Sequence, residues 1–203
     1  MLAPTEPVGV VLAGGASRRM GRDKASLRLG PTSLAERAAG ALSEVLATVV
    51  VADRGHHRVA GCESVRDGDG AGPAAGILGA AAAYPVRDLL VLACDLPAVP
   101  IALLRHLADF SSDRPRDEAG HCAALVPRWR RGIEPLCALY RRSALEALAE
   151  EVRAGRFALR SLLLERLSEV RFLEGPELAA FGDPQRLFAN LNTPDDLALL
   201  ERA

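Results

Sequence analysis

The chain has 203 residues, of which 49% are hydrophobic and 25% are charged, and its formal net charge is −1. This balance excludes a global electrostatic attraction to nucleic acid or to an anionic membrane surface. No apolar run approaches the ~20 residues needed to span a bilayer, and Met1–Pro7 carries an acid and prolines in place of a basic and then apolar leader. A chain of this length buries roughly 70% of its unfolded surface in one core, so we expect a single domain.

In chain order, short apolar runs alternate with segments of helical spacing. We expect strands at Val8–Ala13, Thr48–Ala52, Glu63–Val65, Asp88–Cys94, Cys122–Pro127, Leu136–Tyr140 and Val170–Leu173. We expect helices at Ser33–Leu46, Ile77–Tyr84, Ile101–Phe110, Arg142–Arg153 and Leu159–Leu167 and from Pro194 onward, with a polar loop at Ser111–Gly120. This alternation predicts an α/β fold with one mostly parallel, Rossmann-like sheet and helices on both faces. Ligands of such sheets bind at the carboxyl ends of the strands.

The four cysteines, Cys62, Cys94, Cys122 and Cys137, are widely spaced. None of them forms a C-x-x-C pair, so the pattern indicates neither a zinc site nor a disulfide framework. A reducing cytosol is the simplest compartment for such a chain. We therefore expect a cytoplasmic protein.

The segment after the first expected strand, residues 12–24, has the sequence LAGGASRRMGRDK. Its adjacent glycines let backbone N–H groups approach phosphates or a base edge without a Cβ clash. Three arginines and Lys24, the only lysine of the chain, fall within seven residues and can surround a polyphosphate. The spacing matches neither a Walker A loop nor G-x-G-x-x-G. A solvated basic turn is the alternative, but the glycine pair and the lone lysine favour a nucleotide-binding loop.

This segment resembles the nucleotide-binding signature of the molybdenum cofactor guanylyltransferases, the MobA family within the nucleotidyltransferase superfamily. Its Leu-Ala-Gly-Gly start is closer to the guanylyl branch than to cytidylyl relatives, which more often carry Leu-Ala-Ala-Gly. The resemblance implies a nucleotide-diphospho-sugar-transferase-like fold and catalytic, phosphate-side roles for Arg19 and Lys24. It also implies that the start of the loop binds the nucleotide through Leu12, Ala13, Gly14 and Gly15.

Asp95 stands directly beyond the apolar strand expected at Asp88–Cys94. An acid at this end of a strand can hold a cation in the cleft, and Mg²⁺ typically takes one or two carboxylates, with water and substrate phosphates completing its shell. The alternative is a turn or N-cap aspartate before Pro97. In the resembled family the matching aspartate binds magnesium. The resemblance therefore implies that Asp95 is the metal ligand and a catalytic residue, and that Mg²⁺ is the cofactor.

Two further acids are candidates for the nucleotide site. Asp67 precedes the stretch GPAAG, and family members carry a similar aspartate before Gly-Pro-Leu-Ala-Gly; Asp69 competes with it two residues on. Asp53 ends the second expected strand, at a position where family members often have asparagine, and we expect it to face the nucleotide. His56 and His57 follow in a polar stretch with no third ligand nearby, so we do not interpret them as a metal pair.

Residues 190–197 have the sequence NLNTPDDL. The Thr-Pro pair and the acids account for a helix start, but they do not account for Asn190 and Asn192, which alternate along the chain and share one face. The family carries a very similar Asn-x-Asn-Thr-Pro-Glu-Glu-Leu segment whose asparagines approach the pterin substrate, which implies that both bind the acceptor. Arg156 and Arg160, in a stretch that also looks familial, are further candidates for the phosphate side.

Motifs from residue 9 to residue 197 make the resemblance nearly full length. It implies one nucleotidyltransferase domain over 1–203, in which 1–111 mainly binds the nucleotide and 121–203 mainly binds the acceptor. The implied reaction transfers GMP from GTP to molybdenum-molybdopterin, and proteins that deliver or accept the cofactor are the implied partners. The alternatives are CTP-dependent transfer to the same acceptor, transfer to another phosphorylated metabolite, and a catalytically silent nucleotide-binding regulator.

Overall fold

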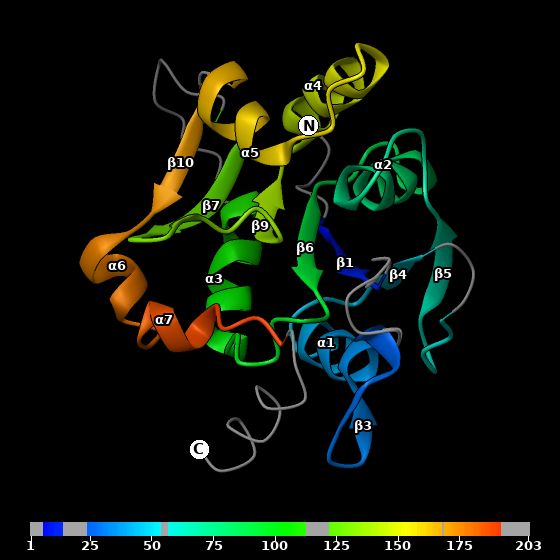
Figure 1. The fold of residues 1–203 in the computed structure, drawn as a ribbon, viewed down its shortest axis with the longest axis vertical. Helices are drawn as coiled ribbons and strands as arrows, with labels where there is room; N and C mark the ends of the chain where they lie inside the picture. Colours follow the sequence, from blue (N-terminus) through cyan, green and yellow to red (C-terminus); the bar gives the residue numbers. More distant parts are fainter. Residues whose placement is uncertain (1–5, 14–23, 54–56, 113–121, 168, 192–203) are drawn as a thin grey trace.

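The computed structural model describes residues 6–13, 24–53, 57–112, 122–167 and 169–191 (Figure 1). Its main sheet has the strand order β10-β7-β9-β6-β1-β4-β5, and β8 pairs with β7 beside this path. The strands of the path are β1 (Val8–Leu12), β4 (Val49–Asp53), β5 (Glu63–Arg66), β6 (Leu89–Ala93), β7 (Ala124–Trp129), β9 (Cys137–Tyr140) and β10 (Val170–Leu173). Along the path only β9 runs antiparallel to its two neighbours, so the expected mostly parallel sheet is confirmed.

The central strands are apolar along their whole length because both faces of the sheet are covered. Every residue of β1, β4 and β6 is buried, as expected for parallel strands between two layers of helices. Successive side chains point to opposite faces, so Val11 joins one hydrophobic core and Val10 joins the other. The two cores hold the sheet between the helices and keep its carboxyl edge in place.

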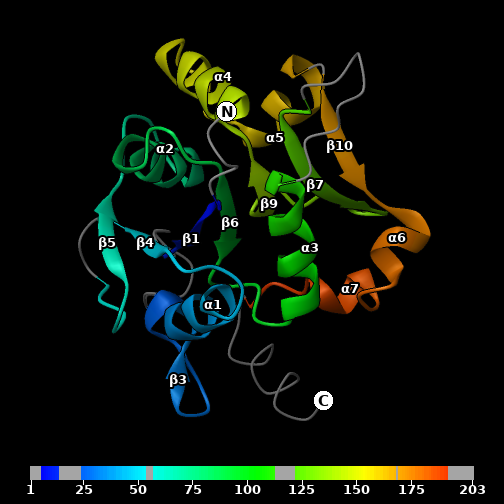
Figure 2. The ribbon, with the colours of Figure 1, turned by 180° about the vertical axis from the view of Figure 1, so that it is seen from behind.

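Helices cover both faces, as Figures 1 and 2 show from opposite sides. One core includes residues of α1 (Leu34–Ser43), α3 (Ile101–Ser112), α6 (Gly175–Ala179) and α7 (Pro184–Leu187). The other includes residues of α2 (Pro73–Ala83), α4 (Arg142–Arg153), α5 (Leu159–Ser161) and the π-helical turn η2 (Leu162–Arg166). The α/β fold class with helices on both faces is therefore confirmed.

Local signals explain where the helices start. Ser33 caps α1 in a capping box: its hydroxyl accepts from the Glu36 N–H at 3.2 Å, while the Glu36 carboxylate accepts from the Ser33 N–H at 2.6 Å. These hydrogen bonds hold the pKa of Glu36 below its usual value. α2 begins at Pro73, four residues before the expected start, because proline favours the first helical position and Gly72 has a positive φ of 63° that suits the turn before it.

Several small elements were not expected from the sequence. They are the 3₁₀ turn η1 (Lys24–Ser26), the hairpin of β2 (Arg28–Leu29) with β3 (Thr32–Ser33), the strand β8 (Gly132–Ile133), and the short helices α6 and α7. The expected helix at 159–167 is divided between α5 and η2. The helix expected from Pro194 and most of the expected polar loop lie outside the described residues. Within the described part of the chain, no helix has the length and apolarity to cross a membrane.

Candidate active site

The site candidates of the first half of the chain gather at the carboxyl edge of the sheet. β1 lies between β4 and β6, and Leu12 is in register with both Ala52 and Ala93. Beyond the strands, the Ala13 N–H donates to the Ala52 carbonyl, at 3.2 Å. Both Leu12 and Ala13 are buried, and the Leu12 carbonyl accepts from the Cys94 N–H at 3.2 Å. The sequence-predicted Gly14, Gly15 and Arg19, in the following loop, lie outside the described residues.

Lys24 and Asp95 meet at this edge although 71 residues separate them. The Lys24 ammonium donates to Asp95 Oδ2 at 3.4 Å, and 22% and 24% of the two side chains' surfaces remain exposed. Lys24 opens η1, and its carbonyl accepts from the Leu27 N–H at 3.0 Å, which fixes the backbone below the side chain. The structure thus places the only lysine of the chain beside the predicted metal ligand, in a position that solvent and a ligand can reach.

The C-terminal segment also reaches Asp95. The Leu191 N–H donates to the Asp95 carbonyl at 3.0 Å, and the Leu191 side chain is buried in the core next to α1 and α3. Asn190, one residue earlier, is exposed. The predicted acceptor-binding Asn190 is therefore one residue away from a backbone contact with Asp95, while Asn192 lies outside the described residues.

Asp53 ends β4 as a buried carboxylate, with only 2% of its surface exposed. Its Oδ2 accepts from the His57 backbone N–H at 2.5 Å and lies 2.8 Å from His57 Nδ1. A buried carboxylate needs such partners, because burial without hydrogen bonds is costly. Sequence reasoning considered the adjacent histidines only as metal ligands, and it missed that His57 is the partner of Asp53. The structure therefore places His57 against Asp53 at the end of β4.

Asp67 lies directly after β5 and is half-buried. A Cβ built on Gly76 in α2 would lie 3.6 Å from Asp67 Oδ1 and 2.9 Å from Leu12 Cδ2, so the absence of a side chain at Gly76 lets both residues approach the helix. Asp69 is exposed and lies in a groove between α2 and α4 that Asp67 also lines. Of the two competing aspartates, Asp67 is the one that the structure brings next to β1.

One acidic side chain near the site, Glu134, is not among the site residues predicted from the sequence. Glu134 follows β8, and its Oε1 accepts from the Trp129 indole N–H at 2.8 Å. Burial raises the pKa of Glu134, the Trp129 hydrogen bond and the charge of Arg160 lower it, and the charge of Asp95 raises it. Glu134 is therefore close enough to Asp95 for the two charges to interact. Glu134 opens a stretch, Glu134–Tyr140, that resembles the matching part of the family, and this resemblance was the available signal.

Arg156, predicted for the acceptor side, makes a bidentate ion pair in this structure. Its Nε and Nη2 donate to the two carboxylate oxygens of Glu151 in α4, each at 2.6 Å. This pair lowers the pKa of Glu151 and raises that of Arg156. Arg156 can bind an acceptor phosphate only if it leaves Glu151.

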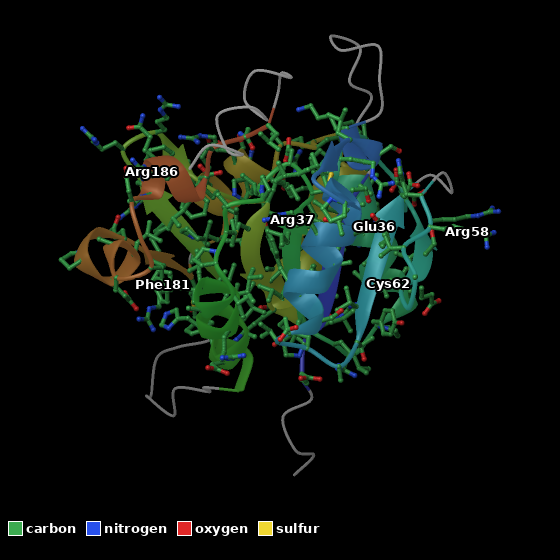
Figure 3. All side chains as sticks on the ribbon, turned by 90° about the horizontal axis from the view of Figure 1, so that it is seen from below. Glu36, Arg37, Arg58, Cys62, Phe181 and Arg186 are labelled. Atoms are coloured by element: carbon green, nitrogen blue, oxygen red, sulfur yellow. The ribbon has the colours of Figure 1, made fainter. Side chains whose placement is uncertain are left out.

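Figure 3 shows the carboxyl edge from below. Glu36 and Arg37 lie on α1, which covers part of this view, and Arg58 extends away from the fold. Phe181 and Arg186 lie on the opposite side, with α6 and α7. The helices α1 and α7 thus flank the edge at which Asp95 is placed.

The donor chemistry of the site fits magnesium carried by a phosphate substrate. Asp95 offers a half-buried carboxylate at a strand end. Within the described residues no group of three or more His, Cys, Asp or Glu side chains could hold a metal ion. Magnesium is often bound by one or two carboxylates together with substrate phosphates, so a protein cage is not required.

Comparison with known proteins agrees with this geometry. The family model described as the MobA-like NTP transferase domain matches residues 9–170. A molybdenum cofactor guanylyltransferase of Rhizobium leguminosarum bv. trifolii is 37% identical over 205 residues, which is 98% of this chain and 93% of that protein. A relative from Opitutus terrae named "Probable molybdenum cofactor guanylyltransferase" is 39% identical over 197 residues, covering 93% of this chain and 91% of that protein.

Among solved structures, molybdopterin-guanine dinucleotide biosynthesis protein A of Archaeoglobus fulgidus superposes with a TM-score of 0.74. It is 29% identical in sequence, and the match covers 96% of this chain and 97% of that one. The family model and these nearly end-to-end matches confirm the resemblance carried by residues 12–24: the chain belongs to the MobA-like NTP transferase family.

Proposed function

We propose that this chain is a molybdenum cofactor guanylyltransferase, which transfers GMP from GTP to the terminal phosphate of molybdenum-molybdopterin and releases pyrophosphate. The nearly full-length relatives that carry this name support the reaction. The structural observation that supports this reaction is the Lys24–Asp95 ion pair, which lies accessible at the carboxyl end of β6. A protein that only binds nucleotide has no need of this pairing of a metal-binding carboxylate with a phosphate-binding ammonium.

In the proposed reaction, an oxygen of the acceptor phosphate attacks the α-phosphorus of GTP. A bond forms between this oxygen and the phosphorus, and the bond from the α-phosphorus to the oxygen that bridges it to the β-phosphorus breaks. The second pKa of a phosphate monoester is about 6, so the acceptor is already largely ionised at neutral pH. The chain therefore needs no general base, and catalysis consists of positioning and charge stabilisation.

Lys24 and Asp95 have complementary roles in this proposal. When bound, Mg²⁺ supplies positive charge to the nucleotide phosphates, and Asp95 is the residue that would hold it. The Lys24 ammonium leaves the Asp95 carboxylate when the triphosphate enters and donates to a non-bridging oxygen of the α-phosphate. Their 3.4 Å separation and partial exposure suit an exchange of partners, because a loose, solvated pair costs little to open. Arg19 is proposed to offset the charge of the leaving pyrophosphate.

Base selection is proposed to rest on the loop that follows β1. Backbone groups around residues 12–15, other than the Ala13 N–H that the Ala52 carbonyl already holds, are proposed to hydrogen bond to the guanine edge, and Gly15 to permit their close approach. The buried Asp53, held by His57, lies at the end of the neighbouring strand and is proposed to face the same nucleotide. A site that pairs with one base leaves polar groups unpaired when the wrong base enters.

The test uses purified protein, molybdenum-molybdopterin, and GTP, CTP, ATP or UTP, each with Mg²⁺ or with EDTA. We expect dinucleotide and pyrophosphate from GTP with Mg²⁺, none with EDTA, and discrimination against the other bases of about 10⁴. Gly15→Ala should reduce the preference for GTP over CTP. The guanylyl assignment is falsified if the wild-type chain uses CTP at least as well as GTP. Nucleotide binding without pyrophosphate release from any of the four would instead identify a silent regulator.

Three further features belong to the same proposal. We propose that residues 1–111 mainly bind the nucleotide and 121–203 mainly bind the acceptor. We propose a cytoplasmic location, with which the four cysteines agree, since all lie in the described residues and none forms a disulfide. Proteins that deliver the pterin and receive the dinucleotide are the proposed partners, and a pull-down with the purified chain tests them.

A further inference from the structure

One turn in the first half of the chain is rich in glycine. Residues 67–72, which join β5 to α2, have the sequence DGDGAG. Gly70 and Gly72 take positive φ angles of 107° and 63°, a region that glycine enters at low steric cost. Glycine also loses the most conformational freedom on folding, so this turn needs contacts that hold it in one conformation. The placement of Asp67, its first residue, depends on those contacts.

On one side the turn is held by α2. The Gly68 N–H donates to the Ala75 carbonyl at 2.7 Å, and the Ala75 N–H donates to the Gly72 carbonyl at 3.2 Å. A Cβ on Gly68 would lie 2.9 Å from the Gly79 nitrogen, so the backbone of the turn lies directly on the helix. All of these contacts come from within residues 1–111.

On another side the turn is supported from the second half of the chain, where α4 packs with α2 in the same hydrophobic core (Figure 1). A Cβ on Gly70 would lie 3.0 Å from Val152 Cγ1, and 3.3 and 3.5 Å from Cδ1 and Cε1 of the Phe157 ring. Val152 is buried in the last turn of α4, whereas Phe157 follows that helix and keeps 41% of its surface exposed. The Gly70 backbone therefore faces two apolar side chains of the acceptor half.

The backbone that carries the Phe157 ring is anchored to α4. The Gly155 N–H donates to the Val152 carbonyl at 2.9 Å, and the Arg156 N–H donates to the Glu151 carbonyl at 2.8 Å. The bidentate ion pair between the Arg156 and Glu151 side chains ties the same residue a second time. A ring that follows so closely after these contacts is suited to act as a fixed support.

We propose that Phe157 is a positioning residue for the nucleotide: its ring supports Gly70, keeps residues 67–72 in one conformation and so holds Asp67 next to β1. This inference rests on the proposed function and on the expected role of Asp67 in nucleotide binding. Phe157 does not contact the nucleotide but acts through the turn. The second half of the chain thereby contributes to GTP binding, in addition to its proposed part in acceptor binding.

The first experiment removes the ring. Phe157→Ala should raise the Kd for GTP with Mg²⁺ about 10-fold in isothermal titration, because the turn is no longer held in its binding conformation before GTP arrives. Phe157→Leu should restore most of the wild-type affinity, since an apolar side chain again covers Gly70. Leu164→Ala, at an apolar residue of η2 that is 45% exposed, is the matched control and should leave the Kd unchanged.

Two results of this experiment would overturn the proposal. One is an unchanged Kd for GTP in Phe157→Ala, or a Kd that Phe157→Leu does not restore. The other is a rise in the KM for molybdenum-molybdopterin at saturating GTP without a change in the Kd for GTP, which would place the ring on the acceptor. We expect this acceptor KM to stay at the wild-type value.

The second experiment tests whether the ring acts through Asp67. Asp67→Asn by itself should weaken GTP binding. In the Asp67→Asn background, Phe157→Ala should raise the Kd much less than in the wild type, because the carboxylate that the turn positions is already gone. Additive effects of the two substitutions, or a wild-type Kd in Asp67→Asn, would overturn this route. An unchanged Tm in each variant shows that the fold persists.

Failure of the proposed function gives a different result from failure of this inference. If the wild-type chain makes no dinucleotide from GTP and molybdenum-molybdopterin, the proposed function fails before any variant is measured. If the wild type is active and Phe157→Ala keeps the wild-type Kd for GTP, the function holds and only the role of Phe157 is wrong.

Discussion

The sheet has two halves, which adjoin where β6 pairs with β9, close to Asp95. The two halves supply their candidate site residues in different ways. In the half with β5, β4, β1 and β6, all strands are parallel, and each candidate lies at or just beyond a strand end. Asp53 is the last residue of β4, Asp67 directly follows β5, and Asp95 lies two residues after β6. In the half with β9, β7 and β10, the candidates lie on a hairpin, a short helix and the C-terminal segment. Parallel strands place consecutive strand ends at one edge, whereas the second half assembles its part of the site from tertiary contacts.

The two halves also differ in how their charges are used. The first half offers Lys24, which pairs with the accessible carboxylate of Asp95. In the second half, exposed arginines form close ion pairs with neighbouring carboxylates, as Arg128 does with Glu174 and Arg171 does with Glu177. Such surface pairs contribute little to stability, but they keep arginine side chains away from a phosphate. These arginines are therefore held by their neighbours, whereas the partner of Lys24 lies at an edge that a ligand can reach.

The largest expected effect comes from the residue shared by both halves. Asp95→Asn keeps the size and turn chemistry of the side chain but removes the anionic ligand, so kcat should fall by at least about 10³-fold. Pyrophosphate release at saturating GTP and Mg²⁺ measures it, with an unchanged Tm as evidence that the fold persists. Asp109→Asn, exposed on α3, is the matched control. Near-normal magnesium-dependent turnover in Asp95→Asn would remove Asp95 from the site.

The next effect tests whether the nucleotide half needs an ammonium in particular. Lys24→Arg keeps the charge but replaces a compact donor by a wider, planar one, so kcat should fall by about 100-fold, nearly as far as in Lys24→Ala. The measurement is kcat at saturating GTP, because the arginine variant can bind GTP in an unproductive position. Arg37→Lys on the surface of α1 controls for an exchange of the two residue types. If Lys24→Arg retains most of the wild-type kcat, Lys24 supplies only diffuse attraction.

A third prediction concerns the packing that holds the nucleotide half together. Gly79 lies in α2 against the end of β5, and a Cβ there would overlap the Arg66 carbonyl and lie 2.9 Å from the Gly68 nitrogen. Because backbone must move, Gly79→Ala should lower the free energy of unfolding by about 3 kcal/mol, measured by urea denaturation. Gly40→Ala, in α1 with open space around the Cβ position, should raise it by about 0.5–1 kcal/mol. Equal effects in the two variants would contradict the close packing of α2.

The smallest expected effect belongs to the acceptor half. Asn190→Ala removes one neutral hydrogen-bonding side chain next to Leu191, so the acceptor KM should rise about 10-fold or less, with GTP affinity unchanged. Asn192→Ala should behave in the same way. Isothermal titration with GTP supplies the control measurement. A matching loss of GTP affinity would place these asparagines on the nucleotide side and weaken the comparison between the halves.

Much of this molecule follows from local sequence. Several elements agree with their expected positions to within a residue or two: the strands β1, β4, β6 and β10, the helix α4 and the cap at Ser33. They could be predicted because apolar runs, helical periodicity and capping residues can be recognised in the local sequence. Lys24 and Asp95 could be identified for a similar reason, since each stands in a motif that directly follows a buried strand. The matching family confirms the nucleotidyltransferase assignment that these motifs suggested.

Only the tertiary structure decided how the side chains are paired. The order of the sheet, with β1 between β4 and β6, brings Lys24 to Asp95 across 71 residues and brings the Leu191 N–H to the Asp95 carbonyl. Whether an arginine is held by a neighbour, as Arg156 is, or rests on a glycine, as Arg160 does, depends on side-chain directions that residue spacing does not determine. Local sequence sets the elements, whereas strand order and packing set which charges meet, because those contacts join residues that are distant along the chain.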